Sequence, residues 1–440
     1  MKCIVTNDCA KQYWKETDCE MEKVTDCMHT VNIYPEVTGQ QMEGFGGAFT
    51  EASAYNYARL DEKAKKEVIG GYFGEDGLRY NLGRLHIGSC DFGLGNYAYV
   101  KEGDSRMETF SIDHDREQII PMIRAAVKES RTPVHFMAAP WSPPAFMKTN
   151  GEMNHGGKLR QEYYSAWADY YAKYLSEYAK EGIQVGAVTV QNEPEAVQTW
   201  DSCIYTAEEE GKFAVRYLLP ALKKNGLSDV EVFIWDHNKE EMYNRAKKIF
   251  SEEEYRKHID GVAVHWYTGD HFEAVEAVKR MYPEKKIYFT EGCVEYSRFA
   301  DSDDVQKAEM YAHDMIGNFN AGISAFFDWN LLLDEEGGPN HVGNFCAAPV
   351  MCEGTGVAKR LPYYYIGHFS RYVKRGAVQV ASTRYTDKIQ TAAFLNPDGE
   401  RVVVLLNKTG EPLEIVLRED GFGVSMTIEA HSIVTCLYAK

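Results

Sequence analysis

The 440-residue sequence lacks any apolar run close to the roughly 20 residues that a membrane-spanning helix needs. Its first residues, MKCIVTNDCAKQYWKETDCE, lack the apolar core of a secretion signal. These two absences lead us to expect a protein that has no membrane span and resides in the cytoplasm.

Cysteines are present but lack metal-binding spacing. Four of the ten fall early, at Cys3, Cys9, Cys19 and Cys27, and none of these forms a C-x-x-C pair. This argues against a zinc site near the N-terminus. Reduced thiols, as found in cytosolic proteins, are the favoured interpretation.

Positive charge is scarce, because 48 Lys and Arg stand against 66 Asp and Glu, for a net charge of −18. Nucleic acids and anionic membranes repel such a surface, so we expect neither as a partner. The sequence also lacks a phosphate-binding glycine loop and a serine in a nucleophile elbow. We therefore expect no organic cofactor and no serine nucleophile.

What the middle of the chain does contain is a repeated unit, in which a short apolar run ends in polar or aromatic residues and a helical stretch follows. In 116–130 the apolar positions share one helix face, and 165–182 is similar and stops at Gly182. Strands that alternate with helices predict parallel pairing, and eight units fit an α/β fold of the (β/α)₈ TIM barrel type. A doubly wound open sheet is the alternative, but no G-x-G-x-x-G follows the first strand. The eight runs are residues 43–50, 78–89, 133–141, 185–194, 230–238, 261–269, 286–292 and 323–330.

After about residue 375 the sequence changes to short strands separated by turn signals such as Asn396-Pro397-Asp398-Gly399. This pattern predicts a small antiparallel β domain. The strand-like residues 31–37 precede the barrel and are expected to join the same sheets. We therefore expect residues 1–42 to contribute to a side β-sandwich, 43–375 to form the catalytic barrel and 376–440 to form the rest of the sandwich.

Two carboxylates, Glu193 and Glu291, end the fourth and seventh predicted strands. Barrels of this type carry their active site at the C-terminal ends of the strands, so the two can face each other across the mouth. Aromatic faces combined with hydrogen-bonding groups suit a sugar, and a pair of carboxylates is what glycoside hydrolysis requires. The aromatic residues expected around the pair are Trp141, Trp266, Tyr267 and Trp329.

Each of these residues also has a plainer explanation. A glutamate at a strand end can cap a helix or pair with an arginine, and tryptophans usually lie in the core. His265 could ligate a metal, but no second ligand stands at metal spacing, so we expect a hydrogen-bonding histidine and no metal. A sugar-binding protein without catalysis is a further alternative, although such a protein has no need of both Glu193 and Glu291.

Seven segments together resemble glycoside hydrolase family 30, most closely its glucosylceramidase-like branch. They run in order across the barrel and into the β domain. The segments are EGFGGAFTEASA (43–54), APWSPPAFMKTN (139–150), VQNEPE (190–195), GVAVHWYTGD (261–270), FTEGC (289–293), DWNLLLDEEGGPNHVGNF (328–345) and YYIGHFSRYVKRG (364–376).

The resemblance implies a barrel with a side β-sandwich and a retaining double-displacement mechanism that uses no cofactor. It implies Glu193 as acid/base and Glu291 as nucleophile, and the negative charge of Glu291 would favour a protonated Glu193. The other implied roles are Asn192 bonding the sugar 2-hydroxyl, Arg84 orienting the glutamates, Tyr267 beside the nucleophile, Asp91, Trp141 and Trp329 holding the outer hydroxyls, and Asn344 near the site entrance.

The expected function is therefore a retaining β-glycosidase that acts on β-glucosides. Its substrate could be an oligosaccharide, a β-1,6-linked glucan or a glucoside with an apolar aglycone. Specificity for β-xylosides or β-fucosides is the alternative within the family. His341 departs from the glucosylceramidase pattern, which has tryptophan at that place. A carbohydrate or glycoside is the only partner that the sequence predicts, and it predicts no oligomeric state.

Overall fold

The computed structural model describes residues 1–24, 28–299 and 301–439. The nine cysteines within these ranges carry free thiols, and Cys27 lies outside them. None of the helices in the described ranges has the length and apolar character needed to cross a membrane.

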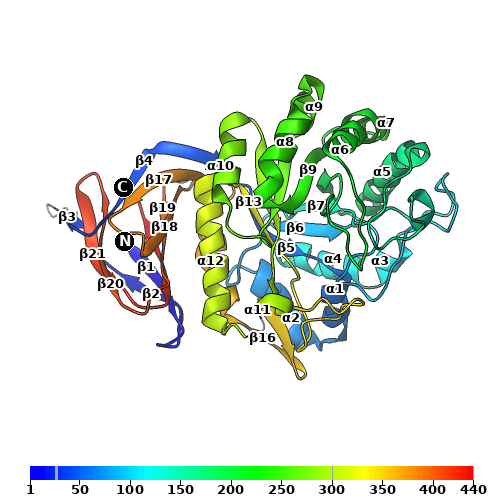
Figure 1. Ribbon diagram of the computed structural model, residues 1–440. Coiled ribbons are helices and arrows are strands. Elements are labelled where there is room, and N and C mark those ends of the chain that lie inside the picture. Colours follow the sequence, from blue (N-terminus) through cyan, green and yellow to red (C-terminus); the bar gives the residue numbers. More distant parts are fainter. Residues whose placement is uncertain (25–27, 300, 440) are drawn as a thin grey trace.

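Eight parallel strands of the described chain close into a barrel, which confirms the expected fold and excludes the open sheet (Figure 1). Each of the eight apolar runs contains one of these strands. The strands are β5 (Gly44–Ala48), β6 (Leu82–His86), β7 (His135–Ala139), β8 (Val185–Thr189), β9 (Glu231–Asn238), β10 (Gly261–His265), β11 (Lys286–Glu291) and β13 (Ala325–Asp328).

The predicted helix over 116–130 is two helices, because the chain breaks at Gln118 between α3 and α4. Pro121 lacks the backbone N–H that a continuous helix would need at that position, so α4 starts anew just before it. The second predicted helix forms as α5, and Gly182 follows its end with a φ of 81°.

Helices cover the outside of the barrel (Figure 1). They are α1 (Glu51–Arg59), α2 (Glu62–Phe73), α3 (Asp113–Glu117), α4 (Ile119–Glu129), α5 (Tyr164–Lys180), α6 (Ala207–Phe213), α7 (Leu219–Lys224), α8 (Met242–Phe250), α9 (Glu253–His258), α10 (Phe272–Met281), α11 (Tyr296–Phe299), α12 (Asp304–Ala321) and α13 (Leu361–Ser370). Short 3₁₀ turns lie at Ala145–Met147, Gln161–Tyr163 and Lys239–Glu241, and a π-helical turn lies at Ala214–Leu218.

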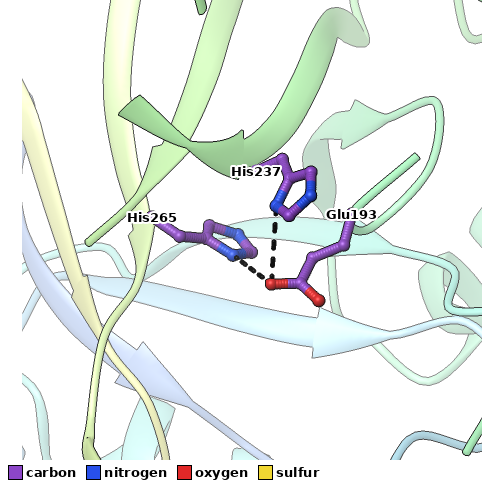
Figure 2. A group of neighbouring side chains, drawn as sticks. All are labelled: Glu193, His237 and His265. Atoms are coloured by element: carbon purple, nitrogen blue, oxygen red, sulfur yellow. Dashed lines mark hydrogen bonds and ion pairs between the residues drawn. The ribbon is translucent and has the colours of Figure 1, made fainter. Parts of the chain in front are cut away.

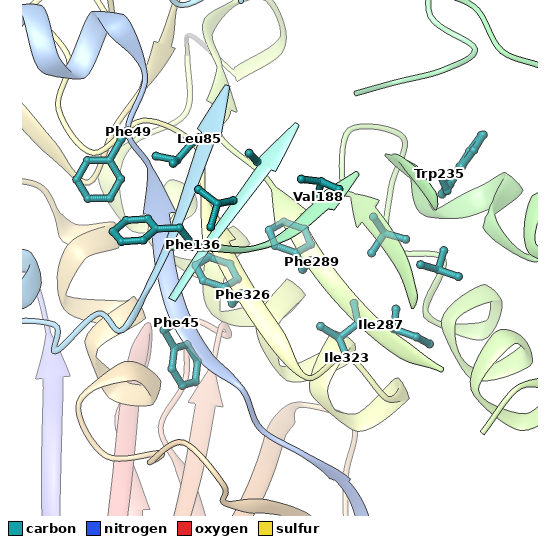
Figure 3. Close-up of a cluster of buried hydrophobic side chains, with 14 of the residues drawn as sticks. Phe45, Phe49, Leu85, Phe136, Val188, Trp235, Ile287, Phe289, Ile323 and Phe326 are labelled. Carbon is teal, nitrogen blue, oxygen red and sulfur yellow. The ribbon is translucent and has the colours of Figure 1, made fainter. Parts of the chain in front are cut away.

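The barrel wall separates two kinds of packing. Side chains on its outer face, among them Phe136, Val188 and Phe289, join the core beneath the helices (Figure 3). Inside the barrel, β6 to β11 contribute one side chain each and β13 contributes two to a separate apolar floor, which includes Leu82, Phe233 and Phe327. Above this floor the inward positions turn polar, and the buried charged groups Arg84, Asp236 and Glu291 lie towards the mouth.

Gly46 shows why the first strand is rich in glycine. A Cβ atom added to Gly46 would lie 2.2 Å from the backbone oxygen of Leu82 on the neighbouring strand. No side chain fits at such a distance, so close packing of β5 against β6 requires glycine here.

A second sheet of ten described strands forms the side domain, in the order β2-β1-β22-β19-β18-β17-β4-β20-β21-β3. Its core contains Val31, Val403, Leu417 and Val434. Its strands are β1 (Lys2–Asn7), β2 (Gln12–Asp18), β3 (Glu22–Lys23), β4 (Thr30–Gln41), β17 (Val378–Arg384), β18 (Ile389–Leu395), β19 (Arg401–Asn407), β20 (Leu413–Glu419), β21 (Phe422–Ile428) and β22 (Ser432–Tyr438).

Both ends of the chain build this domain (Figure 1). β4 contains the predicted strand 31–37 and pairs with β17 and β20, as expected. The hairpin of β1 and β2 was not predicted, because most side chains of β2 are exposed at the sheet edge and show no clear apolar alternation. The segment limits at residues 42 and 375 stay a prediction.

The side domain is fixed to the barrel through α12 and α13. His368 of α13 is buried and lies 2.8 Å from the hydroxyls of both Thr6 in β1 and Thr435 in β22. Burial and the charge of Arg371 lower the pKa of His368 to about 3, so the ring stays neutral and bridges the two strands. The indole of Trp14 donates to the backbone oxygen of Tyr364, also in α13.

Two small antiparallel strand pairs lie outside the barrel and the large sheet. β12 (Val294–Glu295), shortly after Glu291, pairs with β14 (Cys346–Ala347), and β15 (Val350–Glu353) forms a hairpin with β16 (Gly356–Lys359). The first pair joins the segment after β11 to the long loop after β13, so it fixes two walls of the site described next.

Candidate active site

Glu193 and Glu291 meet at the mouth of the barrel, on either side of one imidazole. Glu291 is the last residue of β11, and Glu193 follows β8. Glu193 Oε1 lies 3.4 Å and Glu291 Oε1 lies 4.0 Å from the same atom, Nδ1 of His265 at the end of β10. Two residues 98 positions apart in the sequence thus share one small space.

The backbone at Glu193 is strained. Its φ is 48°, in the left-handed region that non-glycine residues rarely occupy, and Pro194 follows. Its N–H donates to the backbone oxygen of Asp236, and Tyr171 donates its hydroxyl to the oxygen of Val190 at 2.6 Å. These bonds hold the chain in a sharp turn that aims the Glu193 side chain into the mouth.

Arg84 of β6 lies beneath the site with its side chain fully buried. It donates to Glu291 Oε2 at 2.5 Å, to Asn192 Oδ1 at 2.9 Å and to Asp236 Oδ2 at 3.0 Å. The guanidinium also lies 4.9 Å from the ring centre of Trp141. One planar group therefore sets the positions of several predicted site residues at once.

Asp236 of β9 is the second buried charge, and sequence reasoning did not assign it to the site. Besides Arg84, it accepts from Thr189 at 2.7 Å, Thr290 at 2.6 Å and the Nε2 nitrogen of His265 at 3.1 Å. Burial alone would raise its pKa, but Arg84 and these donors hold the pKa of Asp236 below its usual range. Asp236 is thus a permanent anion that fixes the His265 ring.

A cavity of about 140 Å³ opens above these groups. Trp141 and Trp329 stack in one of its walls with ring centres 5.3 Å apart. Asn344 donates to Asp91 Oδ2 at 3.1 Å, and the Tyr267 hydroxyl donates to Glu291 Oε1 at 2.9 Å. The residues lining the cavity are Asp91, Phe92, Trp141, Asn192, Glu193, Gln198, Trp200, His237, Asn238, Tyr267, Glu291, Cys293, Glu295, Trp329 and Asn344.

Trp266 does not belong to this wall, contrary to expectation. Its ring packs against Phe289 and Tyr311, and its indole donates to the backbone oxygen of Cys293. Trp266 and Tyr267 are adjacent in the chain and point in different directions, and only Tyr267 reaches the cavity.

Residues 42–373 match the model of the glycosyl hydrolase family 30 TIM-barrel domain, and residues 376–436 match that of the family 30 β-sandwich domain. The chain belongs to glycosyl hydrolase family 30. The resemblance noted in the sequence is thereby confirmed, and the protein is a glycoside hydrolase.

Relatives of this family 30 enzyme cover nearly its whole length. Lysosomal acid glucosylceramidase of Mus musculus is 33% identical, over 93% of this chain and 83% of that protein. Among solved structures, SrfJ from Salmonella typhimurium is 41% identical with a TM-score of 0.97, over 100% of this chain and 99% of the other. The endo-β1,6-glucanase BT3312 is 26% identical with a TM-score of 0.89, over the same shares.

Protonation in this family 30 site differs from the expectation that Glu193 rests protonated. Burial alone would raise the pKa of Glu193, but the hydrogen bond from His265 and the charges of His265 and His237 lower it. Burial lowers the pKa of His265, but Glu291, Asp236 and Glu193 raise it to about 9. Of the pair formed by Glu193 and His265, the histidine therefore holds the proton and the glutamate is ionised.

The pKa of Asp91 is shifted in the opposite direction to that of Glu193. Burial and the charge of Glu291 raise the pKa of Asp91 well above its usual range, against the opposing hydrogen bond from Asn344. Asp91 therefore holds a proton near neutral pH in the empty cavity.

Several cavity residues were missed by sequence reasoning, namely His237, Gln198, Trp200, Glu295 and Cys293. His237 stood among polar residues at the end of the fifth predicted strand, which was its only signal. Gln198 and Trp200 lie on a loop and Glu295 ends the two-residue strand β12. All three lie beyond the ends of the barrel strands, where the alternation of buried and exposed positions gives no guidance.

The raised pKa of His265 predicts a specific loss of stability with rising pH. A pKa above the ordinary value of about 6.5 means that the stabilisation is complete below pH 6.5 and is lost as pH rises through about 9. The unfolding free energy of the wild type should fall by roughly 3 kcal/mol from this group across that interval. Urea unfolding at several pH values, compared with His265→Gln, measures this share.

The matched control is His155→Gln, because the His155 side chain is exposed and bound to Glu152 on the surface. In this variant the unfolding free energy should fall with rising pH as steeply as in the wild type, whereas in His265→Gln it should fall less steeply. An unchanged slope in His265→Gln would contradict the assignment of the charge to His265.

Proposed function

We propose that this enzyme hydrolyses β-glucosidic bonds by retaining double displacement, with Glu291 as nucleophile and Glu193 as acid/base. The observation that carries the proposal is the placement of both carboxylates within 4.0 Å of His265 Nδ1. Retaining enzymes hold their carboxyl groups roughly 5–5.5 Å apart, so that a carboxylate rather than water attacks the sugar. The shared imidazole supports this short spacing.

The surroundings of Glu291 suit a nucleophile. Arg84 and Tyr267 each donate a hydrogen bond to one of its two oxygens and so fix the direction of the carboxylate. In the first step a Glu291 oxygen bonds to the anomeric carbon, the bond from that carbon to the leaving oxygen breaks, and the leaving oxygen takes a proton. These two hydrogen bonds leave the Glu291 side chain little freedom to move.

The surroundings of Glu193 suit proton transfer in both directions. His265 Nδ1 holds a proton 3.4 Å from Glu193 Oε1, so the pair can pass one proton to the leaving oxygen through Glu193. In the second step Glu193 accepts a proton from the attacking water, and the bond between sugar and Glu291 breaks. The proton returns to the pair, which restores the starting state.

The remaining predicted residues suit the first sugar subsite. Asn192 accepts from Arg84 through Oδ1, which leaves its Nδ2 group to donate to the 2-hydroxyl. Asp91, fixed by Asn344, binds the outer hydroxyls beside Trp141 and Trp329. Hydrogen bonds of this kind strengthen as the ring distorts, so they lower the barrier more than they tighten binding.

Glucose is favoured as the sugar because the names of several relatives refer to glucosyl substrates. These are glucosylceramidases and endo-1,6-β-D-glucanases, at 26–34% identity. Structures named as xylanases share at most 19% identity and speak for the fold alone. Gln198 and Glu295 beside Trp200 make the leaving-group side polar as well as aromatic, which favours a second sugar there over a purely apolar aglycone.

The wild-type enzyme should hydrolyse nitrophenyl β-glucoside faster than the matching xyloside, fucoside and galactoside. Initial rates at equal concentrations give kcat/KM for each. A preference for xyloside or fucoside would transfer the proposal to the alternative within the family. Failure to turn over any of the four would contradict an aryl-glucosidase activity of this site.

The two glutamates should respond differently to azide. Glu193→Ala should still form the glycosyl-enzyme from an aryl glucoside whose leaving group needs no proton, then stall until azide yields the β-glucosyl azide. Glu291→Ala forms no intermediate, so azide can enter only from the opposite face and gives the α-azide. The anomeric proton in the NMR spectrum distinguishes the products, and exchanged products would reverse the two roles.

Asp91→Ala should lower kcat/KM for the aryl glucoside by at least ~100-fold, which is roughly 2.7 kcal/mol of transition-state stabilisation. Asp113→Ala is the control, because the Asp113 side chain is exposed at the start of α3. A variant at position 91 with unchanged kcat/KM would place Asp91 outside the first subsite.

A further inference from the structure

Three possible metal ligands converge at the acid/base glutamate (Figure 2). Glu193 Oε1 lies 3.4 Å from His265 Nδ1 and 3.6 Å from His237 Nδ1. All three atoms lie within 4.8 Å of one another. They come from the ends of β8, β9 and β10, which are neighbours in the barrel wall.

These separations match the edges of a tetrahedral site. Zinc bonds of about 2.0–2.2 Å to histidine nitrogen and carboxylate oxygen place neighbouring ligand atoms about 3.3–3.6 Å apart. Two of the three edges already have this length, so a small movement of one imidazole completes the third. The set of two imidazoles and one carboxylate is also one that zinc and copper prefer.

The nitrogen atoms are oriented for this purpose. Asp236 accepts a hydrogen bond from His265 Nε2 at 3.1 Å, so Nδ1 faces Glu193 and would release its proton to solvent when an ion binds. A carboxylate behind a metal-binding histidine has this arrangement in established metal sites. His237 Nδ1 is buried and has no hydrogen-bond partner within the described ranges.

The site also has an approach path and a free position. Glu193 and His237 both line the open cavity, so an ion can enter where the substrate does. The fourth tetrahedral position would face the cavity and could hold water. Glu291 Oε1, at 4.0 Å from His265 Nδ1, stands at the border of the site and adds negative charge.

We propose that Glu193, His237 and His265 form a binding site for a borderline divalent transition-metal ion, for which Zn²⁺ is the probe, and that the bound ion inhibits the enzyme. The ion would occupy the oxygen through which a proton must pass to the leaving group. The inhibition rests on the proposed role of Glu193, whereas the binding does not.

Calorimetric titration of the full chain with Zn²⁺, after dialysis against a chelator, tests the binding. We expect one ion per chain in the wild type and an affinity at least ~100-fold weaker in His237→Ala. The visible spectrum of bound Co²⁺ should report tetrahedral coordination by nitrogen and oxygen. His155→Ala is the matched control, because His155 forms a similar pair with Glu152 at 2.9 Å on the surface.

Glu193→Gln provides a second variant of nearly equal shape, in case His237→Ala fails to fold. It should weaken Zn²⁺ binding by a similar factor even though it is inactive. Absence of binding up to about 1 mM Zn²⁺, or equal affinity in wild type and in both variants, would overturn the proposed site.

Hydrolysis of the aryl glucoside, measured in parallel, tests the inhibition. Zn²⁺ should inhibit the wild type at the concentrations at which it binds, and the chelator should restore the full rate. Relative to its own rate without metal, His237→Ala should need at least ~100-fold more Zn²⁺. Binding at this site without inhibition would overturn the inhibitory effect and count against Glu193 as proton donor, while leaving the site itself in place.

Discussion

The buried guanidinium of Arg84 is the interaction on which the site depends. A charge with no exposure to water is tolerated only when it is paired, and Asp236 and Glu291 supply the pairing through the two terminal nitrogens of the guanidinium. Because one planar group joins both carboxylates and Asn192, Glu291 and Asn192 cannot shift independently. Loss of either carboxylate would leave the guanidinium with one ion-pair partner instead of two.

Left-handed backbone conformations occur at this charge cluster. Glu193 and Asn330, which follow barrel strands, have φ values of 48° and 69°, and Asp236, near the end of β9, has a φ of 49°. Each such residue costs free energy of order 1–3 kcal/mol, and it persists only where surrounding contacts determine it. The tightly packed outer core and the apolar floor provide those contacts, so the barrel holds its polar mouth in a geometry that the mouth alone would not keep.

The sequence predicted the elements that repeat and missed those that depend on contacts between distant segments. All eight barrel strands could be predicted from apolar runs with polar ends, and Glu193 and Glu291 could be predicted because they are glutamates at two of those ends. Asp236 has the same local pattern, yet its importance comes from four partners on other strands. The hairpin of β1 and β2 and the outward turn of Trp266 likewise depend on what packs against them, which residue order does not reveal.

His265 shows how one arrangement can serve two purposes. Its sequence offered no second ligand at metal spacing, and that argument fails in a barrel because neighbouring strands place residues 193, 237 and 265 together. A carboxylate oxygen that faces two imidazole nitrogens attracts positive charge. Here that positive charge is the proton on His265, which the proposed reaction lends to the leaving group. The same attraction for positive charge that makes the pair a proton store therefore also makes it open to capture by a metal ion.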